Sequence, residues 1–181
     1  MNTFTQAKGL YRALLTAMAS AMIAASGSAG AATATNTLGV NGAVVNSCAV
    51  TSTAAIAFGN YDPAVTNLSA NLDQQGTVTV QCTTGAGYTI FLSEGSGTGA
   101  TCSAATPVRA MSDGASHELS YSLYQDSNRT TQWGCDAAND FEGEGTGNAE
   151  AINVYGRVPG GQNQPKGSYS DTLTVTVTYT P

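Results

Sequence analysis

The C-terminal segment decides the fold: it reads Ser170-Asp171-Thr172-Leu173-Thr174-Val175-Thr176-Val177-Thr178-Tyr179 and alternates apolar residues with threonines. Side chains of a β-strand alternate between two faces, so the threonines share one face and the apolar residues share the other. The apolar face holds Leu173, Val175, Val177 and Tyr179. Only Thr180 and Pro181 follow this segment, so we expect the apolar face to meet a core or an incoming strand.

A second alternating segment lies near the other end of the chain. One of its faces holds Leu38, Val40, Gly42 and Val44. An unfinished sheet at one end and a spare strand at the other suggest chains that complete one another. The alternative is that residues 35–46 pair within their own domain, because this segment directly precedes Cys48 and could fold back onto its own sheet.

The composition predicts one all-β domain. The 181 residues are 41% hydrophobic and 10% charged, with 21 glycines and many threonines, and such a composition favours strands over helices. One core is expected at this length. Binding to phosphates needs clustered Lys and Arg, which this sequence does not have, so we expect no nucleic-acid partner. No small-molecule substrate is expected either.

The first residues predict a secretory signal. Lys8 and Arg12 precede an apolar run over residues 13–25, and small residues follow it. The run is too short to span a bilayer. We expect residues 1–31 to be removed by cleavage after Ala31 and the protein to be exported through the periplasm. Four basic side chains then remain, namely Arg109, Arg129, Arg157 and Lys166.

Four cysteines in an exported chain favour two disulfides. Their spacing matches no zinc site and contains no Cys-x-x-Cys motif, so no metal or other cofactor is expected. Three pairings are possible. We favour Cys48 with Cys82 and Cys102 with Cys135, although the sequence alone leaves the choice open. Each of these bridges would close a loop of about 35 residues, which contributes about 3 to 4 kcal/mol of stability in the chain-entropy model.

Short alternating runs separated by Gly, Asn, Asp and Pro are typical of a sandwich or barrel. Besides the C-terminal segment, the predicted strands cover residues 41–50, 56–61, 77–82, 88–92, 119–124 and 152–157. The stretch 95–105 and the acidic, glycine-rich connection 136–150 are predicted to be surface loops.

Several of these runs carry a family pattern, in order, along nearly the whole chain after the signal. They are Ile56-Ala57-Phe58-Gly59-Asn60-Tyr61-Asp62-Pro63, Val78-Thr79-Val80-Gln81-Cys82-Thr83, residues 119–134 ending in Gln132-Trp133-Gly134, Val154-Tyr155-Gly156-Arg157-Val158-Pro159, and residues 167–177. Together they closely resemble the spore coat protein U domain family, which includes the pilin subunits of archaic chaperone-usher pili.

The resemblance implies an incomplete immunoglobulin-like β-sandwich that lacks its last strand and is completed by donor-strand exchange. A periplasmic chaperone lends a strand, an outer-membrane usher polymerises the subunits, and the N-terminal extension of each copy fills the groove of its neighbour. Residues 32–46 are then the donor extension and residues 47–181 the pilin domain. The implied donor residues are Leu38, Val40, Gly42 and Val44, and the implied acceptor groove and chaperone edge are Leu173, Val175, Val177 and Tyr179. A bridge between Cys48 and Cys82 also fits the family.

The predicted function is a structural subunit of such a pilus at the cell surface, supporting adhesion or biofilm formation. One alternative is a secreted spore-coat or matrix polymer built by the same exchange. Another is a carbohydrate-binding surface adhesin, with a glycan site lined by Trp133, Tyr121, Tyr124 and Tyr155. Packing is the simpler interpretation of these aromatic residues.

Other clusters predict no chemistry. Asp113, Ser116 and His117 are the residue types of a catalytic triad, but they crowd one short loop without a nucleophile elbow, so no enzyme is expected. The carboxylates of the connection 136–150 do not have calcium-loop spacing and are interpreted as a solvated surface. Arg129 and Arg157 are interpreted as local salt bridges or turn hydrogen bonds.

Overall fold

The computed structural model describes residues 30–103, 106–136 and 139–181. The predicted signal, residues 1–31, falls almost entirely outside this part of the chain. The chain divides into two units, Met1–Asn41 and Gly42–Pro181, and all the strands belong to the second. In the first unit, residues 30–41 form no helix or strand. Across the described ranges, no helix is long and apolar enough to span a membrane.

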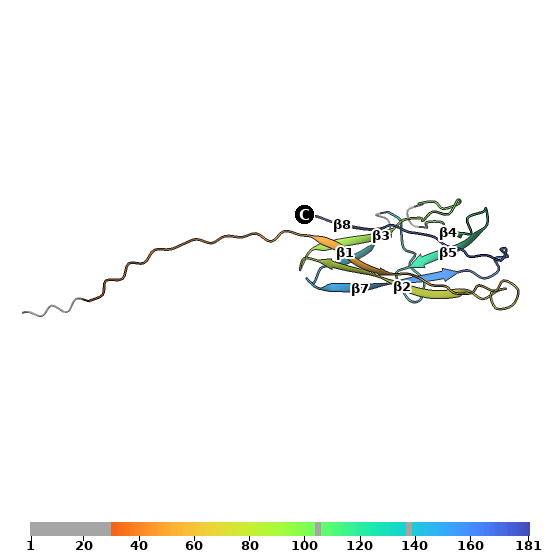
Figure 1. Cartoon of the computed structure of the whole chain (residues 1–181), viewed down its shortest axis with the longest axis horizontal. Coiled ribbons are helices and arrows are strands. Elements are labelled where there is room, and N and C mark those ends of the chain that lie inside the picture. The colour runs from red at the N-terminus through yellow and green to blue at the C-terminus, as the bar shows by residue number, and fades with distance from the viewer. Residues whose placement is uncertain (1–29, 104–105, 137–138) are drawn as a thin grey trace, which may run out of the picture. The chain divides into compact units, whose positions relative to one another are not determined.

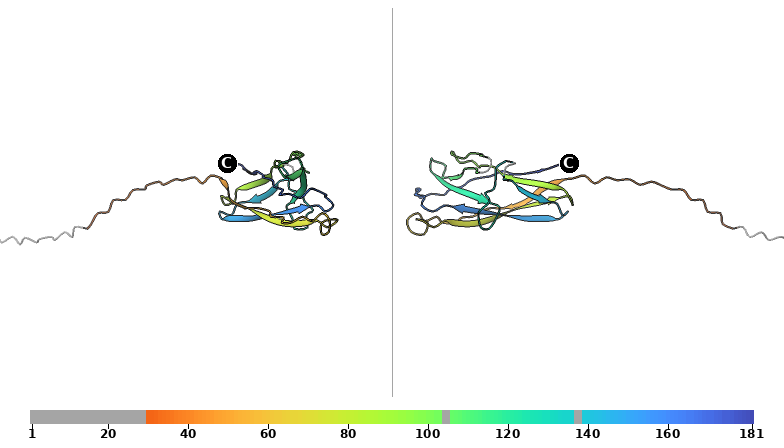
Figure 2. Two further views of the ribbon diagram at one scale, coloured as in Figure 1. Left: turned by 45° about the vertical axis from the view of Figure 1, so that its right-hand side comes forward. Right: turned by 180° about the vertical axis from the view of Figure 1, so that it is seen from behind.

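The second unit has an all-β fold in two sheets, as predicted (Figure 1). Its strands are β1 (Cys48–Ala54), β2 (Leu72–Cys82), β3 (Gly87–Leu92), β4 (Arg109–Ser112), β5 (Glu118–Tyr124), β6 (Phe141–Glu144), β7 (Ala149–Val158) and β8 (Val175–Tyr179). The larger sheet has the order β1-β2-β7-β5-β4 and the smaller has the order β6-β3-β8. All the paired strands are antiparallel. Figure 2 shows the two layers from two further directions.

The core lies between the two sheets and follows from the alternation of the strands. Every second residue is buried in β3 and β5, and the same alternation holds in β2 from Gly76 onward and in β7 from Val154 onward. The fully or nearly fully buried side chains include Val78, Val80, Ile90, Leu123, Trp133 and Val158. Trp133 lies outside the strands, stacks on Phe141 at 5.6 Å between ring centroids, and donates its indole N–H to the carbonyl of Ile90.

The predicted strand over residues 56–61 is wrong. This segment belongs to no strand, and it lies across the inner face of the larger sheet. A Cβ on Gly156 would stand 2.7 Å from the ring of Phe58, and a Cβ on Gly76 would stand 2.8 Å from the Ile56 side chain. The absence of side chains on these two glycines leaves space for segment 56–61. The backbone of this segment pairs with no strand.

Two other boundaries also differ from prediction. The strand predicted over residues 41–50 begins only at Cys48. Just before it, Ser47 bonds both the backbone N–H and the side-chain hydroxyl of Thr83, and the Val45 carbonyl accepts from the same hydroxyl. The acidic connection 136–150 was predicted to be a loop and contains β6, which pairs with β3. Gly143 allows this pairing, because a Cβ there would clash with the ring of Tyr88.

Two disulfides join Cys48 to Cys82 and Cys102 to Cys135. These are the pairs that the sequence analysis favoured. The first bridge fastens the start of β1 to the end of β2, where the two cysteines are directly paired in the ladder. The second bridge joins two connections, one between β3 and β4 and the other between β5 and β6.

Candidate functional site: an open groove beside the last strand

The two sheets leave their outer strands without a partner on one side of the domain. β8 is the last strand of the smaller sheet and β1 is the last strand of the larger one. The two lie next to each other, yet no strand pairing joins them within the described ranges. An unpaired edge presents free backbone N–H and C=O groups, and these groups can accept a further strand.

The inner face of β1 is uncovered. Val50 lies opposite Val80 in the ladder, and directly opposed side chains point to the same face. Val80 is fully buried in the core, whereas Val50 is 39% exposed. Of the seven residues of β1, only Cys48 is not exposed. The smaller sheet therefore does not reach far enough to cover β1.

Two cavities continue this opening along the domain. One measures about 410 Å³ and lies between the end of β1, the segment 54–58 and residues 169–175. The other measures about 650 Å³ and lies between residues 56–63 and 164–169. Because Ile56, Phe58, Met111 and Tyr169 line both cavities, they form one feature, which we call the open groove.

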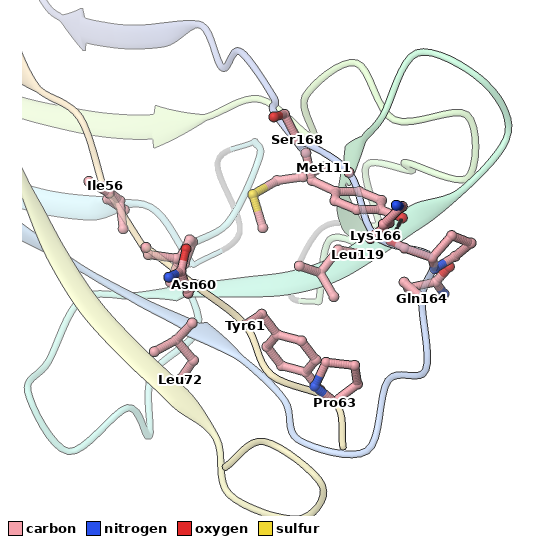
Figure 3. Close-up of a pocket in the computed structure, with 16 residues that line it drawn as sticks. Ile56, Asn60, Tyr61, Pro63, Leu72, Met111, Leu119, Gln164, Lys166 and Ser168 are labelled. Carbon is pink, nitrogen blue, oxygen red and sulfur yellow. Dashed lines mark hydrogen bonds between the residues drawn. The ribbon is translucent and has the colours of Figure 1, made fainter. Parts of the chain in front are cut away.

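Figure 3 shows the larger cavity, with Ile56 and Leu72 on one side and Gln164 and Lys166 on the other. Met111 and Leu119 come from β4 and β5 and lie between these two sides. Several side chains of the open groove are apolar and only partly buried against the core, among them Ile56, Phe58, Leu72, Met111, Leu173 and Val175. The groove thus exposes the margin of the hydrophobic core.

The residues predicted for the acceptor groove lie together at this edge. Leu173, Val175 and Val177 pack partly buried against the core, and Tyr179 is 38% exposed. Leu173 precedes β8 and the other three belong to it. The extended segment before β8 continues the ladder, because the N–H of Ser93 donates to the carbonyl of Thr174 at 3.0 Å.

The residues predicted for the donor strand are unpaired. Leu38, Val40 and Val44 are 89%, 87% and 89% exposed, and residues 35–46 take part in no strand. No atom lies within 4 Å of the position of a Cβ on Gly42. These large apolar side chains are therefore exposed, and residues 35–46 form no strand of their own.

A carboxylate that the sequence analysis did not single out holds the wall of the open groove. Asp171 accepts a hydrogen bond from Tyr121 Oη at 2.6 Å and others from the backbone N–H and hydroxyl of Ser96 at 2.7 and 2.9 Å. Burial and the neighbouring carboxylate raise the pKa of Tyr121 well above its usual value, which keeps its hydroxyl a donor. The one signal in the sequence was a lone acidic residue at the start of an apolar alternation.

Arg109 is buried behind the same wall, with 1% of its surface exposed. Its guanidinium donates to the carbonyls of Ser93, Trp133 and Leu92 at 2.9, 3.0 and 2.6 Å. Burial lowers the pKa of Arg109 to about 10. Arg109 therefore fastens the end of β3 to the loop that carries Trp133, and no carboxylate forms an ion pair with it within the described residues.

The other candidate clusters have structural roles. Arg157 and Arg129 both contact Asp73, with Nε to Oδ1 distances of 2.7 and 3.4 Å. The hydrogen bond from Arg157 is the main reason that the pKa of Asp73 is lowered. The Asp113 carboxylate and His117 Nδ1 are 2.7 Å apart in the turn between β4 and β5, and neither residue lines the open groove.

Neither a metal site nor the full aromatic platform is present in the described part of the chain. The one group there with ligand-like spacing is Cys102, Cys135 and Asp136, and both of its cysteines are already joined in a disulfide. Trp133 is 0% and Tyr121 4% exposed, so neither can stack against a glycan.

Comparisons with known proteins agree with the pattern of motifs. A family model described as Spore Coat Protein U domain matches residues 34–176. The chain is 39% identical over 167 residues to Protein U of Myxococcus xanthus, covering 89% of this chain and 93% of that protein. A structure of the CsuC–CsuE chaperone–tip adhesion subunit pre-assembly complex, from archaic chaperone-usher Csu pili of Acinetobacter baumannii, aligns at 17% identity with a TM-score of 0.44. That alignment covers 74% of this chain and 40% of the solved chain.

Proposed function

This chain belongs to the Spore Coat Protein U domain family, a family of structural, non-enzymatic proteins, and we propose that it is a subunit of an extracellular fibre that polymerises by donor-strand complementation. One observation carries the proposal. The same chain has an unpaired sheet edge beside an open groove and a separate segment whose apolar side chains are nearly fully exposed. The segment of one copy has the chemistry that the groove of another copy needs, because strand addition combines backbone hydrogen bonds with alternating side-chain anchors.

The durability of such a joint has a thermodynamic and a kinetic part. Burying Leu38, Val40 and Val44 contributes about 1.5 to 3 kcal/mol each, and each new backbone hydrogen bond about 0.5 to 1.5 kcal/mol. Ordering the segment costs about 1 to 2 kcal/mol per residue. These sums are comparable, so durability rests on the high barrier to withdrawing a strand as much as on net affinity.

The route to the cell surface follows from the same edge. An exposed strand edge pairs with other edges and aggregates unless it is covered. A periplasmic chaperone that lends a strand to β8 protects the subunit after its signal, residues 1–31, is removed. An outer-membrane usher then exchanges the lent strand for residues 32–46 of the next subunit. The finished fibre extends from the cell surface, where it supports adhesion or biofilm formation.

A second candidate is a secreted spore-coat or matrix polymer. It is favoured by the similarity to Protein U of Myxococcus xanthus over most of both chains. The joint is the same in both candidates, and the difference is whether the polymer stays attached to an usher. Immunogold labelling of intact cells separates them, because a pilus gives filaments rooted in the outer membrane and a matrix polymer gives unattached material.

Deleting residues 32–44 tests the exchange itself. The shortened subunit should still bind its chaperone through β8, but it should not complete another subunit, so pilus-sized oligomers disappear from native gels and micrographs. Fibres of normal abundance from the deleted chain would contradict the proposal.

A matched pair of substitutions refines this test. Val44→Ser removes an apolar side chain that the proposal places in the neighbouring groove, whereas Ala43→Ser changes the adjacent position on the other face of the segment. We expect the first to lower the yield of oligomers and the second to leave it unchanged. Equal yields from the two variants would argue against alternating anchors.

A further inference from the structure

The free edge of β8 has a defined pattern of backbone groups. Just before β8, Ser93 N–H donates to the Thr174 carbonyl and Thr174 N–H donates to Ser93 Oγ, so both backbone groups of Thr174 point toward the β3 side. In an antiparallel ladder, alternate residues turn both of their backbone groups toward the same neighbour. The backbone N–H and C=O groups of Thr174, Thr176 and Thr178 therefore point toward β3. The backbone groups turned toward the free edge belong to Leu173, Val175, Val177 and Tyr179.

The same four residues direct their side chains toward the core side of the smaller sheet. Leu173, Val175 and Val177 pack against the buried cluster, and Tyr179 shares their face by alternation. One set of residues thus carries both the free hydrogen-bonding groups and the apolar side chains. Because directly opposed residues of an antiparallel pair point to the same face, inward side chains of an added strand must stand directly opposite this set.

The segment before β1 supplies a set of the same size and spacing. Its alternating positions are Leu38, Val40, Gly42 and Val44. All six strand pairings of the described sheets are antiparallel, and antiparallel pairing is the more stable kind. One antiparallel register brings all four positions opposite all four residues of the β8 edge. Sliding the strand by two residues in either direction leaves one position unmatched on each strand.

We infer that the segment of one copy adds to β8 of the next in this register, so that Leu38, Val40, Gly42 and Val44 stand opposite Tyr179, Val177, Val175 and Leu173. This inference rests on the proposed function, and it adds which residue of the segment pairs with which residue of β8. Gly42 lies opposite Val175, and Val44 lies opposite Leu173 at the cavity between β1 and residues 169–175. In this register, the side chains of these four residues determine whether a given segment can be added to the β8 edge.

Cysteine cross-linking in the full-length chain tests the register. The native cysteines are all in disulfides, so two introduced thiols are the only free ones. The chain carrying Gly42→Cys and Val175→Cys should form a ladder of covalent oligomers on non-reducing denaturing gels. The matched controls pair Gly42→Cys with Leu173→Cys or with Val177→Cys. They should give at least about tenfold less ladder, because side chains offset by two residues are too far apart for a disulfide.

Strand direction needs a second comparison, since a parallel strand could also bring residues 42 and 175 together. Val40→Cys with Val177→Cys should cross-link only in the antiparallel arrangement, and Val44→Cys with Val177→Cys only in a parallel one. A dominant ladder from the last pair, or from either offset control, would overturn the register while leaving strand exchange intact. If the unsubstituted chain forms no oligomers, the proposed function fails instead.

Hydrogen exchange on the unsubstituted fibre covers the case in which the cysteine variants do not assemble. In the inferred register the amides of Leu173 and Tyr179, at the two ends of the matched set, are both protected in the fibre and both exchange in the free subunit. In a strand shifted by two residues, Asn36 or Asn46 would cover the end of the β8 edge instead, and the amide of Val44 or of Leu38, respectively, would lose its protection in the fibre; that result would overturn the inference.

Discussion

A single buried guanidinium joins two connections of this fold. Arg109 donates to the carbonyl groups of Leu92, Ser93 and Trp133, and its bonds to Leu92 and Trp133 are buried, so it satisfies acceptors that water does not reach. An unsatisfied buried acceptor costs about 1 to 3 kcal/mol. Loss of the Arg109 guanidinium should therefore lower the free energy of unfolding by several kcal/mol.

Replacing Arg109 by methionine keeps the length of the side chain and removes its donors. We expect the free energy of unfolding to fall by about 3 to 5 kcal/mol, measured by urea denaturation of the purified subunit. Arg157→Met is the matched control. It breaks a partly exposed ion pair with Asp73 and should cost about 1 kcal/mol or less. Similar losses from the two variants would contradict the role given to Arg109.

Asp73 makes part of the stability depend on pH. Its pKa in the folded chain is lowered, first by the hydrogen bond from Arg157, so the folded state favours the ionised carboxylate. Its contribution is therefore present at neutral pH and is lost as the pH falls below about 4 toward the lowered pKa. Asp73→Asn should flatten the acid limb of a stability–pH curve. Glu142→Gln, which removes an exposed carboxylate, is the control and should leave that limb unchanged.

At the scale of elements, the groove depends on how firmly β1 is held to its one neighbour. β1 pairs only with β2, its side chains are mostly exposed, and a bulge interrupts its register between Val50 and Ser52. The Cys48–Cys82 bridge fixes its first residue. Without that bridge, we expect the wall opposite β8 to loosen.

The second disulfide provides a matched control for this expectation. The two bridges span sequence separations of 34 and 33, so the entropy of loop closure is about 3 to 4 kcal/mol for each. Changing either pair of cysteines to serine should lower unfolding stability by a similar amount. Only the variant without Cys48–Cys82 should also slow oligomer formation, followed by light scattering at equal fractions of folded subunit. Equal assembly rates would show that β1 does not limit strand uptake.

At the scale of the whole molecule, the connection between the donor segment and its domain is short. Val45 accepts a hydrogen bond from Thr83 at its carbonyl, and the Asn46 side chain donates to the carbonyl of Thr180. Both contacts attach the segment to the end of the domain where β8 finishes. If Val44 enters a neighbouring groove, the very next residue, Val45, already bonds its own domain, so consecutive domains should abut.

Inserting Gly-Ser-Gly between Val45 and Asn46 should therefore separate two properties of a fibre. Strand uptake should remain, because the alternating segment is unchanged, but the joint should bend more freely. Electron micrographs would show a shorter persistence length at unchanged oligomer yield. A fibre as stiff as the original would argue against direct contact between domains, and loss of oligomers would mean that these contacts guide insertion.

Much of this architecture could be predicted from local pattern. The alternation in residues 77–82, 119–124 and 175–179 predicted strands and their buried faces. This was possible because side chains of a strand alternate between two faces regardless of what the strand packs against. The segment 56–61 was mispredicted for the opposite reason. Ile56 and Phe58 alternate like a strand, but they insert over two glycines that are about 20 and 100 residues away in sequence, and no local signal reports such contacts.

The sequence by itself determined the all-β class, the alternating apolar residues of segments 38–44 and 173–179, and the residues available for disulfides. These features depend only on residue type and spacing. Only the tertiary structure decided that β8 and β1 lie next to each other without pairing and that two cavities join into the open groove. It also decided that the hydrogen bonds of Asp171 and Arg109 fix the segments beside this groove. These features arise where two sheets meet. Their physical cause is the relative position of residues distant in sequence, which strand periodicity does not encode.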